Sequence, residues 1–335
     1  MNILKIMPTL TKMMTDNKAL YILVFVLAVS VMASCGQRKK EAFSHLPFPD
    51  VNPPGMMTDA QDRADWLSVH YWDRITDPER AYPSDSLLVS GVLKTEVEQK
   101  FANWISVLEM VLPRTAEKAV AALCTKVLAC EDKDASSEMY ETITPLVEKY
   151  LYDPNSPYRN EDLYGVCASM LASWKGQSPE MKGRYEREAA LCALNKVGTK
   201  AADFRFADKT GKVRSLHGIK APLTLLFFSN PGCEACMNII NVLKGDPRIA
   251  ELISSGRMAV LNIYIDEDIA AWRSYMPVYP AEWYNGFDPD MVIRTETLYD
   301  VRAIPSLYLL DEDKTVIMKD APEHRVFDYL GRLSL

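Results

Sequence analysis

The chain has 335 residues, of which 48% are hydrophobic and 25% are charged. That length and composition are ordinary for a globular protein with two domains, each with its own packed core. With 38 basic against 45 acidic side chains the net charge is −7, which argues against nucleic-acid binding because that function needs basic faces.

The N-terminus carries the pattern of an export signal. Three lysines precede an uncharged stretch at 19–33, and small residues come directly before Cys35. The uncharged stretch is too short to be interpreted as a membrane span. Small residues followed by a cysteine resemble a bacterial lipobox, which implies that Cys35 becomes the lipidated first residue of the mature chain. We therefore predict a lipoprotein signal peptide over 1–35; an ordinary signal peptide with a chance cysteine is the alternative.

The segment that follows the predicted lipid site differs in composition from the rest of the chain. Removing residues 1–35 takes away three Lys and one Asp, so the net charge of −7 becomes −9. Residues 36–57 contain four prolines and little periodicity, which predicts an extended tether with a reach on the order of 25 Å. We expect the protein to lie in the bacterial cell envelope, anchored to the membrane through Cys35 and facing the periplasm.

Residues 58–197 are predicted to form an all-helical domain. Apolar residues recur there at helical spacing, as in Val97, Phe101, Trp104, Ile105, Leu108 and Val111. Further amphipathic segments are predicted at about 116–128, 139–151, 163–174 and 179–194. The pairs Thr58/Gln61 and Thr95/Glu98 are predicted capping boxes, and Ser178 before a proline predicts another helix start.

Four cysteines lie within these helical patterns, namely Cys124, Cys130, Cys167 and Cys192. Cysteine behaves in such positions as a small hydrophobic residue, so we interpret them mainly as core. Exported proteins meet an oxidising compartment. A structural disulfide among the four therefore stays open, because its connectivity does not follow from the sequence.

Residues 198–335 are predicted to form an α/β domain. Short strand-like runs alternate with turns and two helical patterns, which is typical of a sheet covered by helices. The predicted strands are 204–207, 223–228, 258–265, 307–310 and 315–318, and the predicted helices are 234–243 and 326–333. The fold class is thus α + α/β, with the helical domain first.

A pair of cysteines two residues apart, Cys233 and Cys236, follows directly on the predicted strand 223–228. Such a pair closes or reopens a small disulfide ring. A helix N-terminus favours the thiolate of Cys233, so Cys233 is the predicted attacking thiol and Cys236, one turn inside the helix, the resolving thiol. Glu234 opposes the thiolate by a comparable amount, roughly 1 kcal/mol, so we assign Glu234 a weak role in redox tuning.

Several motifs occur in one order along 197–335 and together resemble thioredoxin-like proteins of the TlpA/ResA group. They are Ala202-Asp203-Phe204, the turn ending at Gly211, Ser215-Leu216, the Cys233–Cys236 pair and Ile304-Pro305-Ser306 before a strand. The whole chain resembles envelope lipoproteins that join this module to a helical domain of unknown function. The resemblance implies a sheet core of five strands or fewer, a cis Pro305, and substrate binding at Ile304 and Pro305.

The chain departs from that family in the residues before Cys233, where Asn230-Pro231-Gly232 replaces the usual aromatic residue, and at two buried positions. Thioredoxin has a buried acid at the position of Phe227, and proteins of the ResA type have one at the position of Ile239. A buried carboxylate assists proton transfer during disulfide exchange, so its absence favours a role without catalysis. Glu234 or Asp266 are the candidates to replace it, although a surface carboxylate is usually only solvated.

Other interpretations of the cysteine pair have less support. A metal site needs two further ligands, and a copper site would have to recruit the distant His324, so we expect no metal and no cofactor. The segment 272–284 is rich in aromatic residues, which suits either a groove for a partner or an insertion packed on the sheet; we favour the insertion.

We therefore predict a lipid-anchored thiol–disulfide oxidoreductase, with a role as reductant or isomerase favoured over one as oxidant. Its expected partners are disulfide-containing envelope proteins and a second redox protein that resets the pair. The alternative is a scaffold without catalysis, whose helical domain binds a protein or a glycan and whose disulfide is structural.

Overall fold

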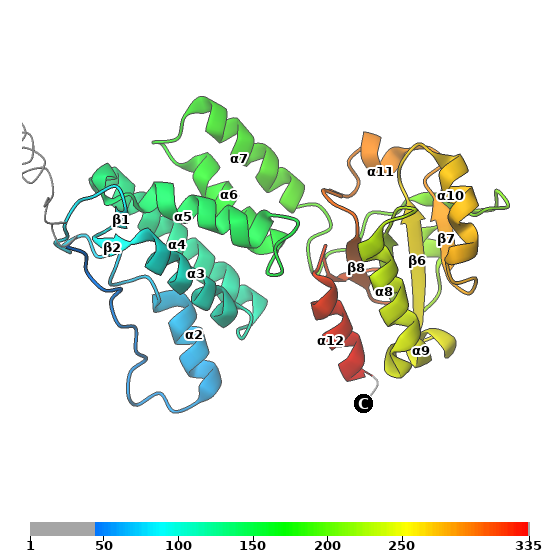
Figure 1. The fold of residues 1–335 in the computed structure, drawn as a ribbon, viewed down its shortest axis with the longest axis horizontal. Coiled ribbons are helices and arrows are strands. Elements are labelled where there is room, and N and C mark those ends of the chain that lie inside the picture. The colour runs from blue at the N-terminus through cyan, green and yellow to red at the C-terminus, as the bar shows by residue number, and fades with distance from the viewer. Residues whose placement is uncertain (1–43, 334–335) are drawn as a thin grey trace, which may run out of the picture. The chain divides into compact units, whose positions relative to one another are not determined.

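The computed structural model describes residues 44–333 (Figure 1). The predicted signal peptide 1–35 and its Cys35 lie outside the described residues. From Leu46 onward the chain forms one compact unit. Among the helices of the described part, none is both long and apolar enough to cross a bilayer.

Part of the predicted tether is packed against the protein. Leu46 forms an isolated bridge with Val92. The backbone amide of Phe48 donates a hydrogen bond to Glu96 Oε1 at 3.0 Å, and the Phe48 ring meets the ring of Trp72 edge-on at 5.7 Å. The chain is therefore held to the helices well before the end of 36–57.

The first part of the unit is helical, as predicted (Figure 1). Its helices are α2 (Ala60–His70), α3 (Lys94–Leu108), α4 (Pro113–Lys133), α5 (Met139–Val147), α6 (Glu161–Ser173) and α7 (Pro179–Cys192), with a short 3-10 turn η1 (Ala135–Ser137) and a π-helical turn η2 (Glu148–Tyr152). Their apolar faces share one core around Trp72, Phe101 and Trp104. A small hairpin of β1 (Leu88–Val89) and β2 (Val92–Leu93) precedes α3 and was not predicted.

The helix starts agree with the sequence only in part. Ser178 caps α7 by accepting a hydrogen bond from the amide of Met181, as predicted. Helix α2 is capped by Asp59 rather than Thr58, because the Asp59 carboxylate accepts from two amides of the first turn. The predicted cap at Thr95 is wrong, since strand β2 runs directly into α3 and Thr95 lies inside the helix.

The interpretation of the helical cysteines as core is confirmed for three of the four. Cys124, Cys167 and Cys192 are buried in the helical core, whereas Cys130 is half-buried, and all four are free thiols. Burial raises the pKa of Cys192 to about 12. In this structure these cysteines therefore act as packing residues.

The second part of the unit is built on a seven-stranded sheet with the order β4-β3-β7-β6-β5-β8-β9. The strands are β3 (Arg205–Ala207), β4 (Val213–Ser215), β5 (Leu223–Phe228), β6 (Met258–Tyr264), β7 (Tyr284–Phe287), β8 (Ser306–Leu310) and β9 (Val316–Met318). The expectation of five strands or fewer is wrong. The two strands that the sequence analysis missed, β4 and β7, are short and carry Arg or Asn where a clear apolar alternation is needed for recognition.

Helices cover both faces of this sheet. Helices α8 (Glu234–Gly245), α9 (Pro247–Ser254), α10 (Ile269–Tyr275) and α12 (Glu323–Leu333) share one core with one face of the strands, and Figure 1 shows α8 and α12 across that face. The short helix α11 (Val292–Thr295) and the 3-10 turn η3 (Leu216–Gly218) cover the other face. Strand β5 is apolar except for Thr224, because it lies between β6 and β8 with both of its faces buried.

The aromatic segment 272–284 packs on the sheet, as favoured from the sequence. Trp272, Tyr279 and Trp283 are all buried in the core that contains α8. The Trp272 ring meets Phe287 of β7 edge-on at 5.0 Å. These aromatic side chains are therefore structural.

Candidate redox-active site

The cysteine pair lies where the central strand β5 leads into helix α8. After Phe228 the chain turns through Ser229-Asn230-Pro231-Gly232 and enters the helix at Cys233. Gly232 has a φ of +73°, a backbone conformation that residues with a Cβ rarely adopt. The turn thereby places the cysteine pair at the N-terminus of α8.

Cys233 and Cys236 form a disulfide with their Cα atoms 5.2 Å apart. Cys233 is the N-cap of α8, and its sulfur accepts a hydrogen bond from the amide of Cys236 at 3.1 Å. Cys233 is half-buried, whereas Cys236 is only 1% exposed. Cys233 is thus the more exposed residue of the pair, and an amide of the first turn of α8 donates to its sulfur.

The Ile304–Pro305 segment lies at the same end of the sheet. Their peptide bond is cis, as expected. Ser306 opens β8 and pairs with Phe228, the last residue of β5, so Pro305 stands beside the turn that carries Cys233. Within residues 44–333 the backbone of Ile304 takes part in no hydrogen bond. Its amide and carbonyl are therefore left without a partner among the described residues.

The two carboxylates considered as replacements for a buried acid have different surroundings. Glu234 is exposed in the first turn of α8. Asp266 accepts a hydrogen bond from the side-chain amide of Asn230 at 2.6 Å and forms an ion pair with Arg294. Asp266 therefore anchors the turn before Cys233, a structural role.

No carboxylate occupies the family positions beneath the pair. Phe227 and Ile239 are buried in the apolar core that also contains Cys236. Among the described residues, no group of three or more His, Cys, Asp or Glu side chains is placed to hold a metal ion.

Comparison with known proteins shows what this chain resembles. A family model described as "Domain of unknown function (DUF5106)" matches residues 30–195. The crystal structure of a thioredoxin-like protein from Bacteroides caccae is 34% identical and covers 84% of this chain and 97% of its own, with a TM-score of 0.73. The chain belongs to the thioredoxin-like family.

Two further solved structures are similar to part of this thioredoxin-like chain. The C-terminal domain of an uncharacterized protein from Bacteroides fragilis is 43% identical, covering 41% of this chain and 97% of its own, with a TM-score of 0.40. A conserved protein of unknown function from the same species is 37% identical, with coverages of 40% and 98% and a TM-score of 0.40. No curated protein matches the chain.

A neutral polar network on the sheet face that carries α8 was not predicted from the sequence. The Ser229 hydroxyl donates to the side-chain oxygen of Asn262. Asn262 in turn donates to Asn285 Oδ1 at 3.0 Å, and Asn285 to the carbonyl of Pro280 at 2.8 Å. Burial raises the pKa of nearby Tyr279, so this side chain is neutral as well. Asparagine in a strand is an unfavourable choice, and that is the signal by which Asn262 and Asn285 are recognisable.

Proposed function

We propose that this protein is a lipid-anchored envelope thiol–disulfide oxidoreductase that acts on protein disulfides through Cys233 and Cys236. The observation that carries the proposal is the contrast between the two sulfurs at the start of α8. Cys233 is half-buried and receives an amide hydrogen bond, whereas Cys236 is shielded. An accessible thiolate at a helix N-terminus attacks, and a shielded neighbour resolves.

The exchange takes place in two steps. In the reduced protein the thiolate of Cys233 attacks one sulfur of a client disulfide, the client S–S bond breaks, and the released client thiolate takes up a proton. The thiolate of Cys236 then attacks Cys233, which breaks the mixed disulfide and releases the client with two thiols. The protein keeps the disulfide, and a redox partner has to return two electrons to it.

Client binding is assigned to the Ile304–Pro305 segment. The unpaired backbone of Ile304 supports this role, because main-chain hydrogen bonds to an extended peptide give affinity without demanding a particular sequence. Glu234, exposed at the first turn of α8, weakens the attraction of the helix N-terminus for a thiolate and so tunes the pair. No cofactor enters this scheme.

The location and the domain division belong to the same proposal. A signal peptide over 1–35 would direct export, and lipidation of Cys35 would hold the protein on a membrane of the cell envelope with its body in the periplasm. Residues 58–197 and 198–335 would act as separate domains, the first of which overlaps the match to a domain of unknown function. We favour a reductant or isomerase over an oxidant.

A second candidate function is a scaffold without catalysis, with a structural disulfide and a helical domain that binds a protein or a glycan. The apolar side chains of Phe227 and Ile239 favour it, because they leave no buried acid to move the proton of Cys236. Cys236→Ser distinguishes the two functions. An oxidoreductase with this change accumulates mixed disulfides with its clients, whereas a scaffold does not.

The deciding experiment is the equilibrium of the cysteine pair in graded glutathione buffers, using the protein from residue 36 onward and reading thiol alkylation by mass. Reversible exchange supports the oxidoreductase. A potential near that of thioredoxin, about −270 mV, indicates a reductant, and one near about −120 mV indicates an oxidant. A disulfide that stays closed until the protein unfolds contradicts the proposal and favours the scaffold.

A further inference from the structure

Six charged side chains are buried together between the last helices of the helical region and the segments that flank β8 and β9. They are Arg159, Glu161, Asp300, Arg302, Lys319 and Asp320. Each side chain is at most 15% exposed, and the three positive and three negative charges balance. The cluster joins residues more than a hundred positions apart in the sequence.

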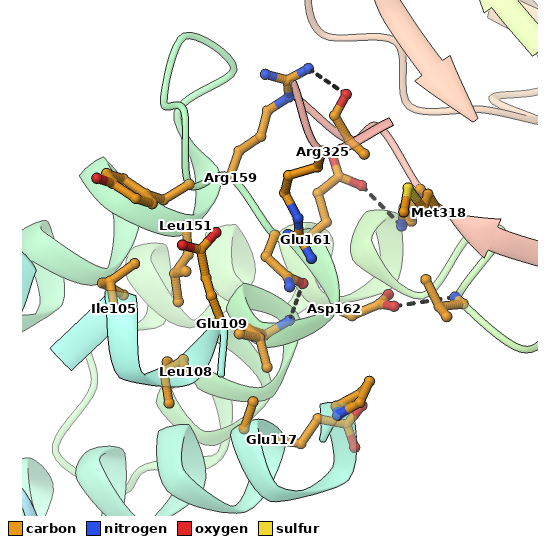
Figure 2. Close-up of a pocket in the computed structure, with 18 of the residues that line it drawn as sticks. Ile105, Leu108, Glu109, Glu117, Leu151, Arg159, Glu161, Asp162, Met318 and Arg325 are labelled. Atoms are coloured by element: carbon orange, nitrogen blue, oxygen red, sulfur yellow. Dashed lines mark hydrogen bonds and ion pairs between the residues drawn. The ribbon is translucent and has the colours of Figure 1, made fainter. Parts of the chain in front are cut away.

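Glu161 is the centre of this cluster. Its Oε1 accepts hydrogen bonds from Nε and Nη2 of Arg302 at 3.1 and 2.7 Å. Its Oε2 lies 2.9 Å from Nζ of Lys319, an interaction visible in Figure 2. Glu161 is also the first residue of α6, where the helix N-terminus favours a negative charge. Two cations and a helix end therefore hold one carboxylate in place.

Arg159 makes a second connection. Its guanidinium donates to the carbonyls of Asp320 and Ala321 at 2.8 and 3.1 Å; the bond to Ala321 is drawn in Figure 2. Its Nε also lies 3.5 Å from Asp320 Oδ2. The other oxygen of the Asp320 carboxylate accepts a hydrogen bond from the Ser306 hydroxyl at 2.6 Å. Arg159 thus reaches Ser306 through Asp320.

Both contacts bracket the segment proposed to bind the client. Arg302, bound to Glu161, stands two residues before Ile304, and Ser306, bound to Asp320, directly follows Pro305. Arg302 is fastened further by donating to the carbonyl of Tyr152 and by lying over its ring at 3.9 Å. Side chains of the helical region therefore hold the loop on both sides of Ile304–Pro305.

We propose that Glu161 and Arg159 are positioning residues of the redox site, which hold the 302–306 loop in the geometry that receives the client backbone. This inference rests on the proposed function, since it assumes that the client binds beside Ile304. The helical region is then part of the oxidoreductase and supports its client-binding wall.

A purely stabilising role explains the cluster less well. Replacing a buried ion pair by apolar residues of similar volume is often neutral or stabilising, because desolvation offsets the attraction between the charges. What such a cluster provides is a defined geometry: Glu161 has two donors from Arg302 in fixed directions. The backbone of Ile304 makes no hydrogen bond that would fix the loop. Contacts from other segments therefore have to hold the loop in position.

The test compares Glu161→Gln with the wild type, using the protein from residue 36 onward. Glutamine keeps the size of the side chain but removes the charge. Arg159→Lys is the second variant, because it keeps the charge and loses the forked donation to Asp320 and Ala321. Glu148→Gln is the matched control, since Glu148 pairs with Arg184 in the same helical region but at the surface.

The first readout is disulfide exchange with two substrates, a peptide that contains an intramolecular disulfide and oxidised glutathione. We expect KM for the peptide to rise by about tenfold to 100-fold in Glu161→Gln, the size expected for a small misplacement of a binding group. Exchange with glutathione, which needs no backbone groove, keeps its wild-type rate. Glu148→Gln leaves both substrates unaffected. Equal losses with both substrates, or no loss with the peptide, overturn the proposal.

The second readout is independent of activity and separates this inference from the proposed function. Hydrogen exchange of the peptide 300–310 is compared with that of β5 in each variant. Faster exchange confined to 300–310 supports the positioning role even if the wild type proves to have no disulfide exchange, a result that would count against the proposed function alone. A uniform increase across both segments, or no increase in Glu161→Gln and Arg159→Lys, overturns the inference.

Discussion

Two buried polar groupings among residues 44–333 are of opposite kinds. In the cluster centred on Glu161, six charged side chains pair with one another beside the 302–306 loop. On the sheet face that carries α8, the network of Ser229, Asn262 and Asn285 is uncharged. The difference suggests a division of roles. The buried charges hold the 302–306 loop in place, whereas the positive potential at Cys233 comes mainly from the start of α8.

The strongest test of this contrast is whether disulfide exchange continues when Cys233 is replaced. Cys233→Ser removes the accessible sulfur, and we expect exchange with a peptide disulfide to fall by at least about 1,000-fold, as for the loss of a nucleophile. Initial rates with a fluorescent peptide disulfide measure it. Cys124→Ser, a change at a free core cysteine, is the control. Residual exchange close to that of the wild type would move the chemistry to another thiol.

The charged grouping is tested by removing its central carboxylate. Glu161→Ala leaves Arg302 and Lys319 buried without their shared partner, so the free energy of unfolding should fall by about 3–5 kcal/mol. Urea denaturation measures this quantity. Glu148→Ala, which breaks a surface pair with Arg184, should cost no more than about 1 kcal/mol. Equal losses in the two variants would mean that the cluster has no special role.

Asp320 gives the charged grouping a pH dependence. Burial, opposed by Arg159, raises the pKa of Asp320 from 3.8 to about 6. The folded state therefore binds its proton more tightly than the unfolded state, and the stability that this supplies below pH 4 is lost as the pH rises through 6. The loss is about 3 kcal/mol, from roughly two pKa units.

The Asp320 effect is isolated by the difference in unfolding free energy between the wild type and Asp320→Asn, measured from pH 4 to pH 7. Asparagine can still accept the hydrogen bond from Ser306 but does not titrate. Glu161, Arg159 and Arg302 surround the site in both proteins. Their own contributions to the pH dependence of the unfolding free energy therefore largely cancel in the difference. We expect the wild type to lose about 2 kcal/mol relative to the variant across this range; a constant difference would contradict the prediction.

The neutral grouping is tested by Asn262→Ala. The change leaves the Ser229 hydroxyl and the Asn285 side-chain oxygen without their partner, so the unfolding free energy should fall by about 1–3 kcal/mol. Thermal and urea unfolding measure it. This loss should not vary between pH 4 and pH 7, because every group involved is uncharged. A pronounced pH dependence would show that the two groupings are coupled.

The smallest expected effect concerns Glu234. Glu234→Gln removes the negative charge beside Cys233, so the reduced protein should react with iodoacetamide at pH 7 faster by up to about fivefold, equivalent to roughly 1 kcal/mol. Raising the salt concentration should shrink the difference between variant and wild type. A slower reaction in the variant would mean that Glu234 assists Cys233 instead.

Prediction from the sequence succeeded where local chemistry is strong. The largely apolar run 223–228 is β5 to the residue, because a strand buried on both faces needs an almost continuous apolar sequence. The cap at Ser178 holds for a similarly local reason. Strand β7 was missed because its residues suit tertiary contacts and not a strand pattern. Asn285 bonds to Asn262, and Gly286 leaves room for the Phe206 ring. Neither contact can be predicted from the local sequence.

The same division applies to the candidate site. Spacing and context along the chain were enough to single out Cys233 and Cys236, and the resemblance to thioredoxin-like proteins implied the cis bond before Pro305. Nothing in the local sequence around Arg302 indicates that Glu161, 141 residues away, accepts its hydrogen bonds. Charged residues are usually exposed, so the sequence predicts these side chains at the surface, and only the folded structure shows that they are buried.

By itself, the sequence determined the order of the helical and α/β parts, the cysteine pair at a helix start and the resemblance to thioredoxin-like proteins, because each follows from local patterns and from their order along the chain. The tertiary structure alone decided which sulfur is shielded, that Ile304 keeps an unpaired backbone, and that Arg159 and Glu161 hold the adjoining loop. Burial and long-range pairing arise only when distant segments pack together and exclude water. No single stretch of the sequence is therefore sufficient to predict them.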